Sequence, residues 1–178
     1  KGKIVGLPNP DNTIYDIEAQ TIQTSYQHYK SMQLGELLEN LPIPEMVSKL
    51  GKIDMKAHFE GLIKNFNASA ILKTQIGDID LVGSSINNGK TTTYYADILS
   101  DKFDVGYLLN QDWINTTGLS AKAEVKGTDL NSMEANLTAS LKDLNVKGIN
   151  YDSVYVEGGM KNKEITAQLS IKDNDVNL

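Results

Sequence analysis

The sequence predicts an all-β fold built as a curled antiparallel meander, in which each strand pairs with the next strand along the chain. The first observation is a strict alternation of apolar and polar residues, clearest in "MEANLTASL", Met133 to Leu141. Successive side chains of a strand point to opposite faces of a sheet, so this alternation describes a strand with one apolar face and one polar face. The second observation is that turn residues separate the alternating runs at the short spacing typical of all-β folds.

Alternation continues through most of the 178 residues and predicts the strands in chain order. Polar residues fill the positions between the apolar ones, as expected of half-buried strands. The apolar positions are Ile53, Met55, Ala57 and Phe59; Phe66, Ala68, Ala70 and Leu72; Ile79 and Leu81; Tyr94, Ala96 and Ile98; Leu119, Ala121, Ala123 and Val125; Met133, Ala135, Leu137, Ala139 and Leu141; Leu144 and Val146; Val154 and Val156; and Ile165, Ala167, Leu169 and Ile171.

Two turn sequences between these runs predict hairpins. Asn88-Gly89, in the stretch "INNGKT", is a dipeptide that strongly favours a tight hairpin turn. A second hairpin is expected in "GGMKNKE", with its turn near Lys161 to Lys163. Both turns support a sheet made of neighbouring antiparallel strands.

One segment, residues 34–50, predicts helix instead of strand. The apolar residues of "LGELLENLPIPEMVSKLG" recur at helical spacing on either side of Pro42 and Pro44. Because proline ends or kinks a helix, we expect a short helix, a kink, and a second short helix from about Pro44 to Leu50 that ends at Gly51.

Internal similarity predicts a stack of related units. The segment "FEGLIKNFNASAIL", residues 59–72, resembles "VKGTDLNSMEANLTASL", residues 125–141, and residues 4–22 form a weaker third copy. Repeats of this kind indicate that one supersecondary unit stacks on the next. We therefore expect a single β-rich segment of a longer repeat protein, with approximate repeats at 1–50, 51–117 and 118–178.

Charge and composition exclude several classes of function. The formal net charge of −6 is spread without a basic stripe, so nucleic acid is not expected as a partner. The chain has no cysteine and therefore no thiol nucleophile or disulfide. His28 and His58 are its only histidines, and neither belongs to a metal-ligand or nucleophile–base motif. We expect no enzyme activity, and no catalytic residue, cofactor or metal ion.

The apolar face of the predicted sheet must be covered by something. Burying one large aliphatic side chain is worth about 1.5–3 kcal/mol, and monomers rarely expose large contiguous apolar patches. Either the sheet closes as a sandwich or barrel filled by its own side chains, or it curls into a half-pipe whose groove holds a guest. In the second arrangement, residues 34–50 would plug one end of the groove. Periodicity is compatible with both arrangements.

Several stretches carry a family resemblance that covers nearly the whole chain. They are "KGKIVGLPNPDNTIYDIEAQTIQT", "SYQHYKSMQLGELL", "TYYADILSDKFDVGYLL" and the run from Ser132 to Leu178. Together they resemble the TamB (translocation and assembly module)/AsmA-like family of envelope proteins, in the form found in Bacteroides-type bacteria. The resemblance implies a long periplasm-spanning protein with an inner-membrane anchor and a curled sheet, called a β-taco, with a hydrophobic interior. It also implies an Omp85-type outer-membrane barrel as partner and contains no catalytic motif.

The sequence and this resemblance together predict a periplasmic segment that serves outer-membrane biogenesis. Its hydrophobic groove would bind or conduct phospholipid acyl chains first, and unfolded outer-membrane protein strands second, while the inner-membrane anchor lies outside this fragment. The alternatives are a closed β-sandwich acting as an adhesin or carbohydrate-binding module, and a purely structural periplasmic spacer. The expected groove wall comprises Ile53, Met55, Phe59, Phe66, Leu72, Leu81, Ile98, Leu119, Val125, Met133, Leu137, Leu141, Val146, Val156, Leu169 and Ile171.

Overall fold

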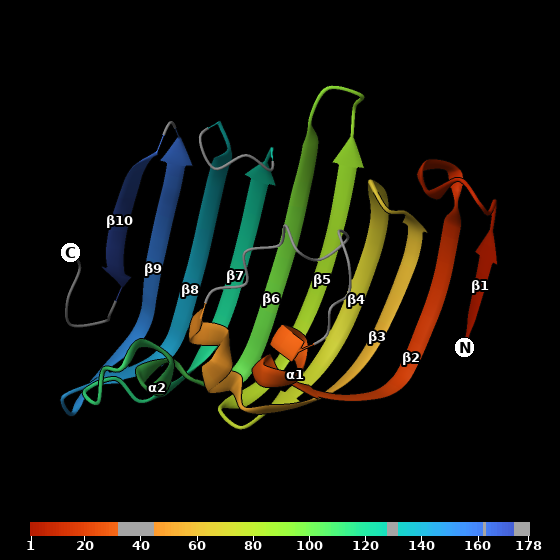
Figure 1. Ribbon diagram of the computed structural model, residues 1–178. Coiled ribbons are helices and arrows are strands. Elements are labelled where there is room, and N and C mark those ends of the chain that lie inside the picture. The colour runs from red at the N-terminus through yellow and green to blue at the C-terminus, as the bar shows by residue number, and fades with distance from the viewer. Residues whose placement is uncertain (32–44, 128–131, 162, 173–178) are drawn as a thin grey trace.

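A single antiparallel sheet of ten strands, in the order β1 to β10, makes up the protein (Figure 1). The computed structural model describes residues 1–31, 45–127, 132–161 and 163–172. Each strand pairs with its neighbours along the chain, so the predicted all-β meander is confirmed. The strands are Gly2–Val5 (β1), Ile14–Ser25 (β2), Lys52–Leu62 (β3), Asn65–Thr74 (β4), Gly77–Asn87 (β5), Thr92–Asp104 (β6), Thr116–Lys126 (β7), Glu134–Val146 (β8), Ile149–Lys161 (β9) and Glu164–Lys172 (β10).

The sheet is curved, and short helical elements lie on its concave side at one end of the strands (Figure 1). We call this the lower end, and the end with the β3–β4, β5–β6, β7–β8 and β9–β10 hairpin turns the upper end. The lower-end elements are the α-helices Tyr26–Ser31 (α1) and Val105–Leu109 (α2) and the 3₁₀ helix Glu45–Leu50 (η3). A further 3₁₀ turn, Pro10–Asn12 (η1), lies in the β1–β2 connection.

Both predicted hairpins are present. The β5–β6 turn contains Gly89 at φ 85°, and the Asn87 side chain accepts a hydrogen bond of 2.7 Å from the Gly89 amide. The Asn88 side chain accepts bonds of 3.0 Å from the amides of Lys90 and Thr91, so three amides hold this turn closed. In the β9–β10 turn, Lys163 takes the left-handed conformation at φ 66°.

The expected helical segment is matched in its second half. The 3₁₀ helix η3 covers Glu45–Leu50 and is followed by Gly51 at φ 68°, the left-handed conformation that ends a helix. Residues 34–44, with the first expected helix and its prolines, lie outside the described residues. The helices α1 and α2 were not predicted, because elements of six and five residues are too short to show a helical period.

A small apolar core closes the lower end of the sheet. Ile76, Phe103 and Val105 are buried together, and partly buried residues from η3, α2 and the neighbouring strands pack against them. Asp104 caps α2, because its carboxylate accepts a hydrogen bond of 2.8 Å from the Tyr107 amide. The stretch "FDVGYLL" (103–109) therefore contains the end of β6 and the helix α2, with which the connection to β7 begins.

The sheet does not close on itself. Its accessible surface is 12446 Å², whereas a compact protein of 19.6 kDa would expose about 8,600 Å². Among the described residues there is one sheet, and no second sheet packs on its concave face. Of the two arrangements left open by the periodicity, the structure has the open, curled one.

The similar sequence segments correspond to hairpins. Residues 59–72 and 125–141 include the upper-end turns of β3–β4 and β7–β8, and residues 4–22 form the β1–β2 hairpin. The expected boundary at 50/51 falls between η3 and β3, whereas the one at 117/118 falls inside β7. One sheet runs through all three expected units, and the repeat division stays a prediction.

Candidate binding surface on the concave face

The pairing register lines up side chains in rows that run across the strands. Residues paired on neighbouring strands place their side chains on the same face of the sheet. One such row begins at Ile17 on β2 and continues to Phe59 on β3. From there it follows Ala68, Gly83, Ala96, Ala123, Leu137, Gly158 and Ala167 to the last strand.

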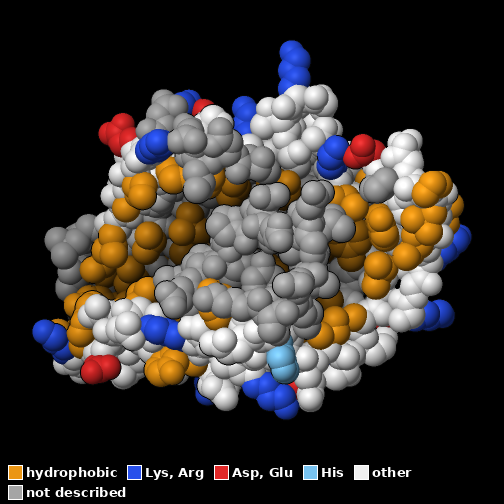
Figure 2. All heavy atoms as spheres, in the orientation of Figure 1, with side chains coloured by type: hydrophobic (Ala, Val, Ile, Leu, Met, Phe, Trp, Pro, Cys, Tyr) orange, Lys and Arg blue, Asp and Glu red, His pale blue; other side chains and the backbone are white. Residues whose placement is uncertain are grey.

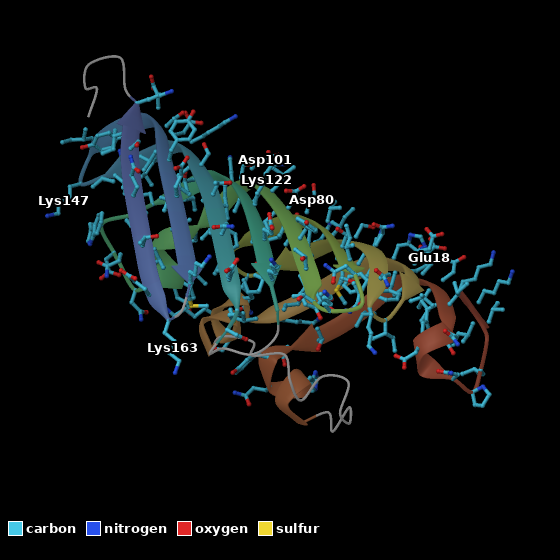
Figure 3. The ribbon with its side chains drawn as sticks, turned by 90° about the horizontal axis from the view of Figure 1, so that it is seen from above. Glu18, Asp80, Asp101, Lys122, Lys147 and Lys163 are labelled. Carbon is cyan, nitrogen blue, oxygen red and sulfur yellow. The ribbon has the colours of Figure 1, made fainter. Side chains whose placement is uncertain are left out.

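Most residues of the predicted groove wall lie on one face, which is the concave one. The labelled polar side chains Glu18, Asp80 and Lys122 belong to the opposite face and point away from the helical elements (Figure 3). The wall residues that share the concave face are Ile53, Met55, Phe59, Phe66, Leu72, Leu81, Ile98, Leu119, Val125, Leu137, Leu141, Val156, Leu169 and Ile171.

Met133 and Val146 lie outside this regular pattern. Met133 precedes β8 and is half-buried there. Val146 has the opposite parity to Leu141, so a regular strand would place the two on opposite faces. Asp143, between them, has φ 54° and interrupts the alternation, and Leu144 directly after it is buried.

The concave face contains further apolar residues that were not included in the predicted wall. Four of them, Ile79, Tyr94, Val154 and Ile165, already stood at apolar positions of the alternating runs. Ile17 and Met160 also lie on this face, opposite Phe59 and Ala135 respectively. All of these residues can be identified from their odd or even position within the strand, once the pairing register between neighbouring strands is known.

Most of the wall remains partly exposed among the described residues. Ile53 is buried, but most wall residues are half-buried, and Leu137 and Leu169 remain 43% and 61% exposed. Figure 2 shows hydrophobic side chains gathered on both flanks of this face. A sealed core would bury such residues almost completely. The concave face is therefore an open apolar trough.

Small residues form much of the floor of the trough, between rows of larger ones. Ala57 and Ala70 pair in one central row, and Ala121 and Ala139 pair farther along it. Larger residues flank these positions toward the lower end, namely Met55, Leu72, Ile79, Leu119, Leu141 and Val154. Toward the upper end the flanking residues include Phe66, Tyr94, Val125 and Met160.

The floor is long in the direction across the strands. Neighbouring strands lie about 4.8 Å apart, so ten strands give a floor of roughly 43 Å along the curve of the sheet. Aromatic rings line it near β2 to β4, where the Phe59 and Phe66 ring centroids are 5.0 Å apart. Tyr15 meets Phe59 edge-on at 6.4 Å. Such a surface suits a long, slender apolar molecule.

A lysine fastens η3 to α2 at the lower end of the trough. Lys49 Nζ donates hydrogen bonds to the carbonyl oxygens of Tyr107 and Leu108 at 2.9 and 2.7 Å. It also donates one of 2.7 Å to the side-chain oxygen of Asn110, which caps α2 in the left-handed conformation. Carbonyl oxygens at a helix C-terminus attract a cation in this way, although that of Tyr107 also accepts a hydrogen bond of 3.3 Å from the Asn110 amide.

The outer face is mostly polar but not uniformly so. Cross-strand ion pairs such as Lys122–Asp97, at 3.3 Å, lie on it. A hollow of about 720 Å³ lies there too, lined by Asp78, Asp80 and Lys142 among others. The outer face also exposes three large apolar residues, Ile71, Val82 and Leu99. The simple rule that one face is apolar and the other polar therefore does not hold strictly.

The ionisable groups of the described residues form a few close pairs. A hydrogen bond and the charge of Lys161, 2.9 Å away, lower the pKa of the half-buried Glu134. His58 lies 3.1 Å from Asp16 on the outer face. Within the described ranges, no cluster of three His, Cys, Asp or Glu side chains is placed to hold a metal ion. No helix in this part of the chain is long and apolar enough to cross a bilayer.

Comparison of the chain with protein-family models, curated proteins and solved structures gives no significant match.

Proposed function

We propose that this protein is a non-catalytic segment whose concave apolar face binds the acyl chains of phospholipids. The observation that carries the proposal is the open apolar trough itself, with large side chains such as Leu137 and Leu169 left substantially exposed within it. Monomers rarely leave contiguous apolar surface of this extent without a use for it. An amphiphile that covers the floor removes that surface from water.

Backbone chemistry favours acyl chains over unfolded protein strands as the guest on this face. The strands β2 to β9 pair on both sides, so their backbone groups are engaged with their neighbours. A polypeptide lying on an apolar floor would leave its own N–H and C=O groups without partners, at a cost of several kcal/mol for each buried group. An acyl chain has no such groups.

The wider role is proposed from the resemblance to the TamB/AsmA-like family. In this proposal the segment belongs to a periplasmic conduit that moves phospholipid between the inner and outer membranes during outer-membrane biogenesis. An inner-membrane anchor outside this fragment and an Omp85-type barrel would be its partners. The open trough supports this role because a conduit needs an apolar path that the protein does not fill itself.

A direct test is lipid extraction of the chain purified from a bacterial host, followed by mass spectrometry. We expect co-purified phospholipid, and saturable binding of a fluorescent fatty acid by the delipidated protein. A protein that carries no lipid and binds no acyl probe would overturn the proposal. That result would favour the purely structural spacer, whose length would be set by the strand spacing of about 4.8 Å.

The closed β-sandwich adhesin or carbohydrate-binding module is less well supported. Its binding loops would rest on two packed sheets, whereas the described residues form one open sheet.

A further inference from the structure

The β5–β6 turn contains the one Asn-Gly dipeptide of the chain, Asn88-Gly89. The turn reaches beyond the neighbouring turns at the upper end of the sheet, and both residues are exposed (Figure 1). Asparagine is a chemically labile residue, and a glycine after it lacks the Cβ that would crowd the backbone amide. A Cβ built at Gly89 would meet nothing within 4 Å, so solvent has access to this side of the turn.

Deamidation within such a dipeptide follows a defined path. The Gly89 nitrogen gives its proton to hydroxide and attacks Cγ of Asn88. The bond from Cγ to Nδ2 breaks, and this nitrogen leaves as ammonia after taking a proton from water, which regenerates the hydroxide. Water then opens the succinimide at either carbonyl and leaves aspartate or isoaspartate. In the succinimide Cγ takes the place of the amide hydrogen, so the direction of the Gly89 N–H bond controls the attack.

In the folded turn this direction is occupied by Asn87. Its side-chain oxygen accepts a hydrogen bond of 2.7 Å from the Gly89 amide. Asn87 is itself held from two sides. Its Nδ2 donates a bond of 2.7 Å to Thr92 Oγ1, and its backbone amide donates one of 2.7 Å to the side-chain oxygen of Asn65. These contacts keep the acceptor on the Gly89 amide while the hairpin stays closed.

The Asn88 side chain is fixed as well, but by contacts that suit the reaction. Its Oδ1 accepts bonds of 3.0 Å from the Lys90 and Thr91 amides. Negative charge develops on this oxygen when the Gly89 nitrogen attacks Cγ, and amide donors already in place stabilise such a charge. The carbonyl group is therefore prepared for attack, while the attacking amide is held back.

We propose that Asn88 is a self-modification site whose rate is set by the hydrogen bond from the Gly89 amide to Asn87. While this bond is intact, Asn88 reacts slowly, and when it opens the Gly89 nitrogen can turn toward Cγ. Loss of one hydrogen bond corresponds to a change in rate of about two- to tenfold. Asn87 is thus a positioning residue. This role is independent of what the concave face binds.

Peptide mass spectrometry of the purified chain, aged in mildly alkaline buffer, tests the site. We expect the mass gain of deamidation on the peptide that contains Asn88, with aspartyl and isoaspartyl products resolved by chromatography. The chain unfolded in urea should react about two- to tenfold faster, because it lacks the Asn87 contact. Asn88→Gln should abolish the signal at this peptide, since its longer side chain would have to close a larger ring.

Substitutions around the Gly89 amide give the sharper test. Asn87→Ala removes the acceptor and should raise the rate of the folded chain about two- to tenfold, to that of the unfolded chain. Thr92→Val removes the hydroxyl that holds the Asn87 side chain and should raise the rate less. Asn87→Asp keeps an acceptor for the Gly89 amide, with the Thr92 hydroxyl as donor to its other oxygen. It should therefore react as slowly as the native chain.

Three results would overturn the inference. The first is a folded native chain that modifies Asn88 as fast as the chain in urea. The second is a folded Asn87→Ala variant that reacts no faster than the native chain. The third is an Asn87→Ala variant that exceeds the native chain equally in urea, which would make the effect one of local sequence. Circular dichroism shows whether each variant is folded, and Thr92→Val replaces Asn87→Ala in the comparison if the latter unfolds.

Discussion

Leu137 lies on the concave face opposite Ala123 and Gly158, and both partners are too small to cover it. It remains 43% exposed, so it contributes only part of the 1.5–3 kcal/mol that full burial of a leucine would bring. A residue in this position is better suited to contact a guest than to hold the fold together.

We expect Leu137→Asp to fold with a stability loss of about 1 kcal/mol and to bind a fluorescent fatty acid at least about tenfold more weakly. The reason is that an acyl chain on the floor would have to desolvate the new carboxylate. Ile71→Asp is the matched control, because Ile71 is 51% exposed on the outer face between Lys56 and Asp80. Equal acyl binding by the Leu137→Asp variant and the native chain would show that Leu137 is not part of the binding surface.

The pKa of Glu134, at the upper end of β8, depends on its contact with Lys161. Its pKa is lowered, first by the hydrogen bond from Lys161 and then by the charge of the same lysine. A group whose pKa is lower in the folded state stabilises the fold above its unfolded pKa and loses that contribution as the pH falls through its folded pKa.

We expect Lys161→Gln to raise the pKa of Glu134 toward its ordinary value, with only the charge of Lys126 still lowering it, and to reduce the contribution of Glu134 to the acid dependence of unfolding. Carboxyl-carbon NMR titration measures the first effect, and thermal unfolding between neutral and acidic pH measures the second. Lys122→Gln, which breaks only the pair with Asp97, should leave the Glu134 titration unchanged. A Glu134 pKa that does not move in Lys161→Gln would contradict the assigned cause.

At the scale of single elements, the α2 turn depends on a close approach of two backbone segments. A Cβ atom at Gly106 would lie 1.9 Å from the Ile114 carbonyl oxygen and 2.8 Å from that of Gln111. The Gln111 amide donates a hydrogen bond of 2.8 Å to the Gly106 carbonyl, which holds this approach. The glycine of "FDVGYLL" is therefore a packing requirement at the closed end of the trough.

We expect Gly106→Ala to lower the free energy of unfolding by about 1–3 kcal/mol, because the α2 turn has to move to admit the methyl group. Urea denaturation measures the change. Gly83→Ala is the control, because a Cβ there would meet its nearest neighbour, the Tyr95 carbonyl oxygen, at an ordinary 3.5 Å. A variant as stable as the native chain would mean that this turn adjusts freely.

At the scale of the whole molecule, the open sheet should give the chain a larger radius of gyration than a compact chain of the same length. A compact chain of 178 residues would have a radius of gyration of about 16 Å. A curved single sheet is more extended, as its large accessible surface of 12446 Å² already indicates.

We expect small-angle X-ray scattering at low concentration to give a radius of gyration clearly above about 16 Å and a profile that fits an open sheet. The protein concentration should be low enough that no dimer contributes to the measured radius of gyration. A compact radius in dilute solution would mean that the sheet closes on itself, and the proposal of an open trough would fail with it.

The sequence by itself determined strands β3 to β10 and which of their side chains share a face, but it indicated no alternating run for β1 and β2, and it separated Leu144 and Val146 from the run that continues into them in β8. The strands and their faces follow from a local rule, the period of two, and tight turns such as the one at Asn88-Gly89 are likewise set by a few adjacent residues. The same rule was insufficient where the backbone departs from regularity. It does not locate the register shifts at Ala19/Ile22 and Ser100/Phe103, or the left-handed conformation of Asp143 within β8.

Only the tertiary structure decided whether the apolar face is sealed or open. Closure depends on how twist, bulges and bends accumulate over ten strands, and these are sums over residues far apart in the sequence. The short helices α1 and α2 and the lysine that fastens η3 to α2 also depend on such distant contacts, since Lys49 bonds residues 58 to 61 positions away. An alternating pattern fixes which side of a strand is apolar, but only the assembled sheet fixes what that side faces.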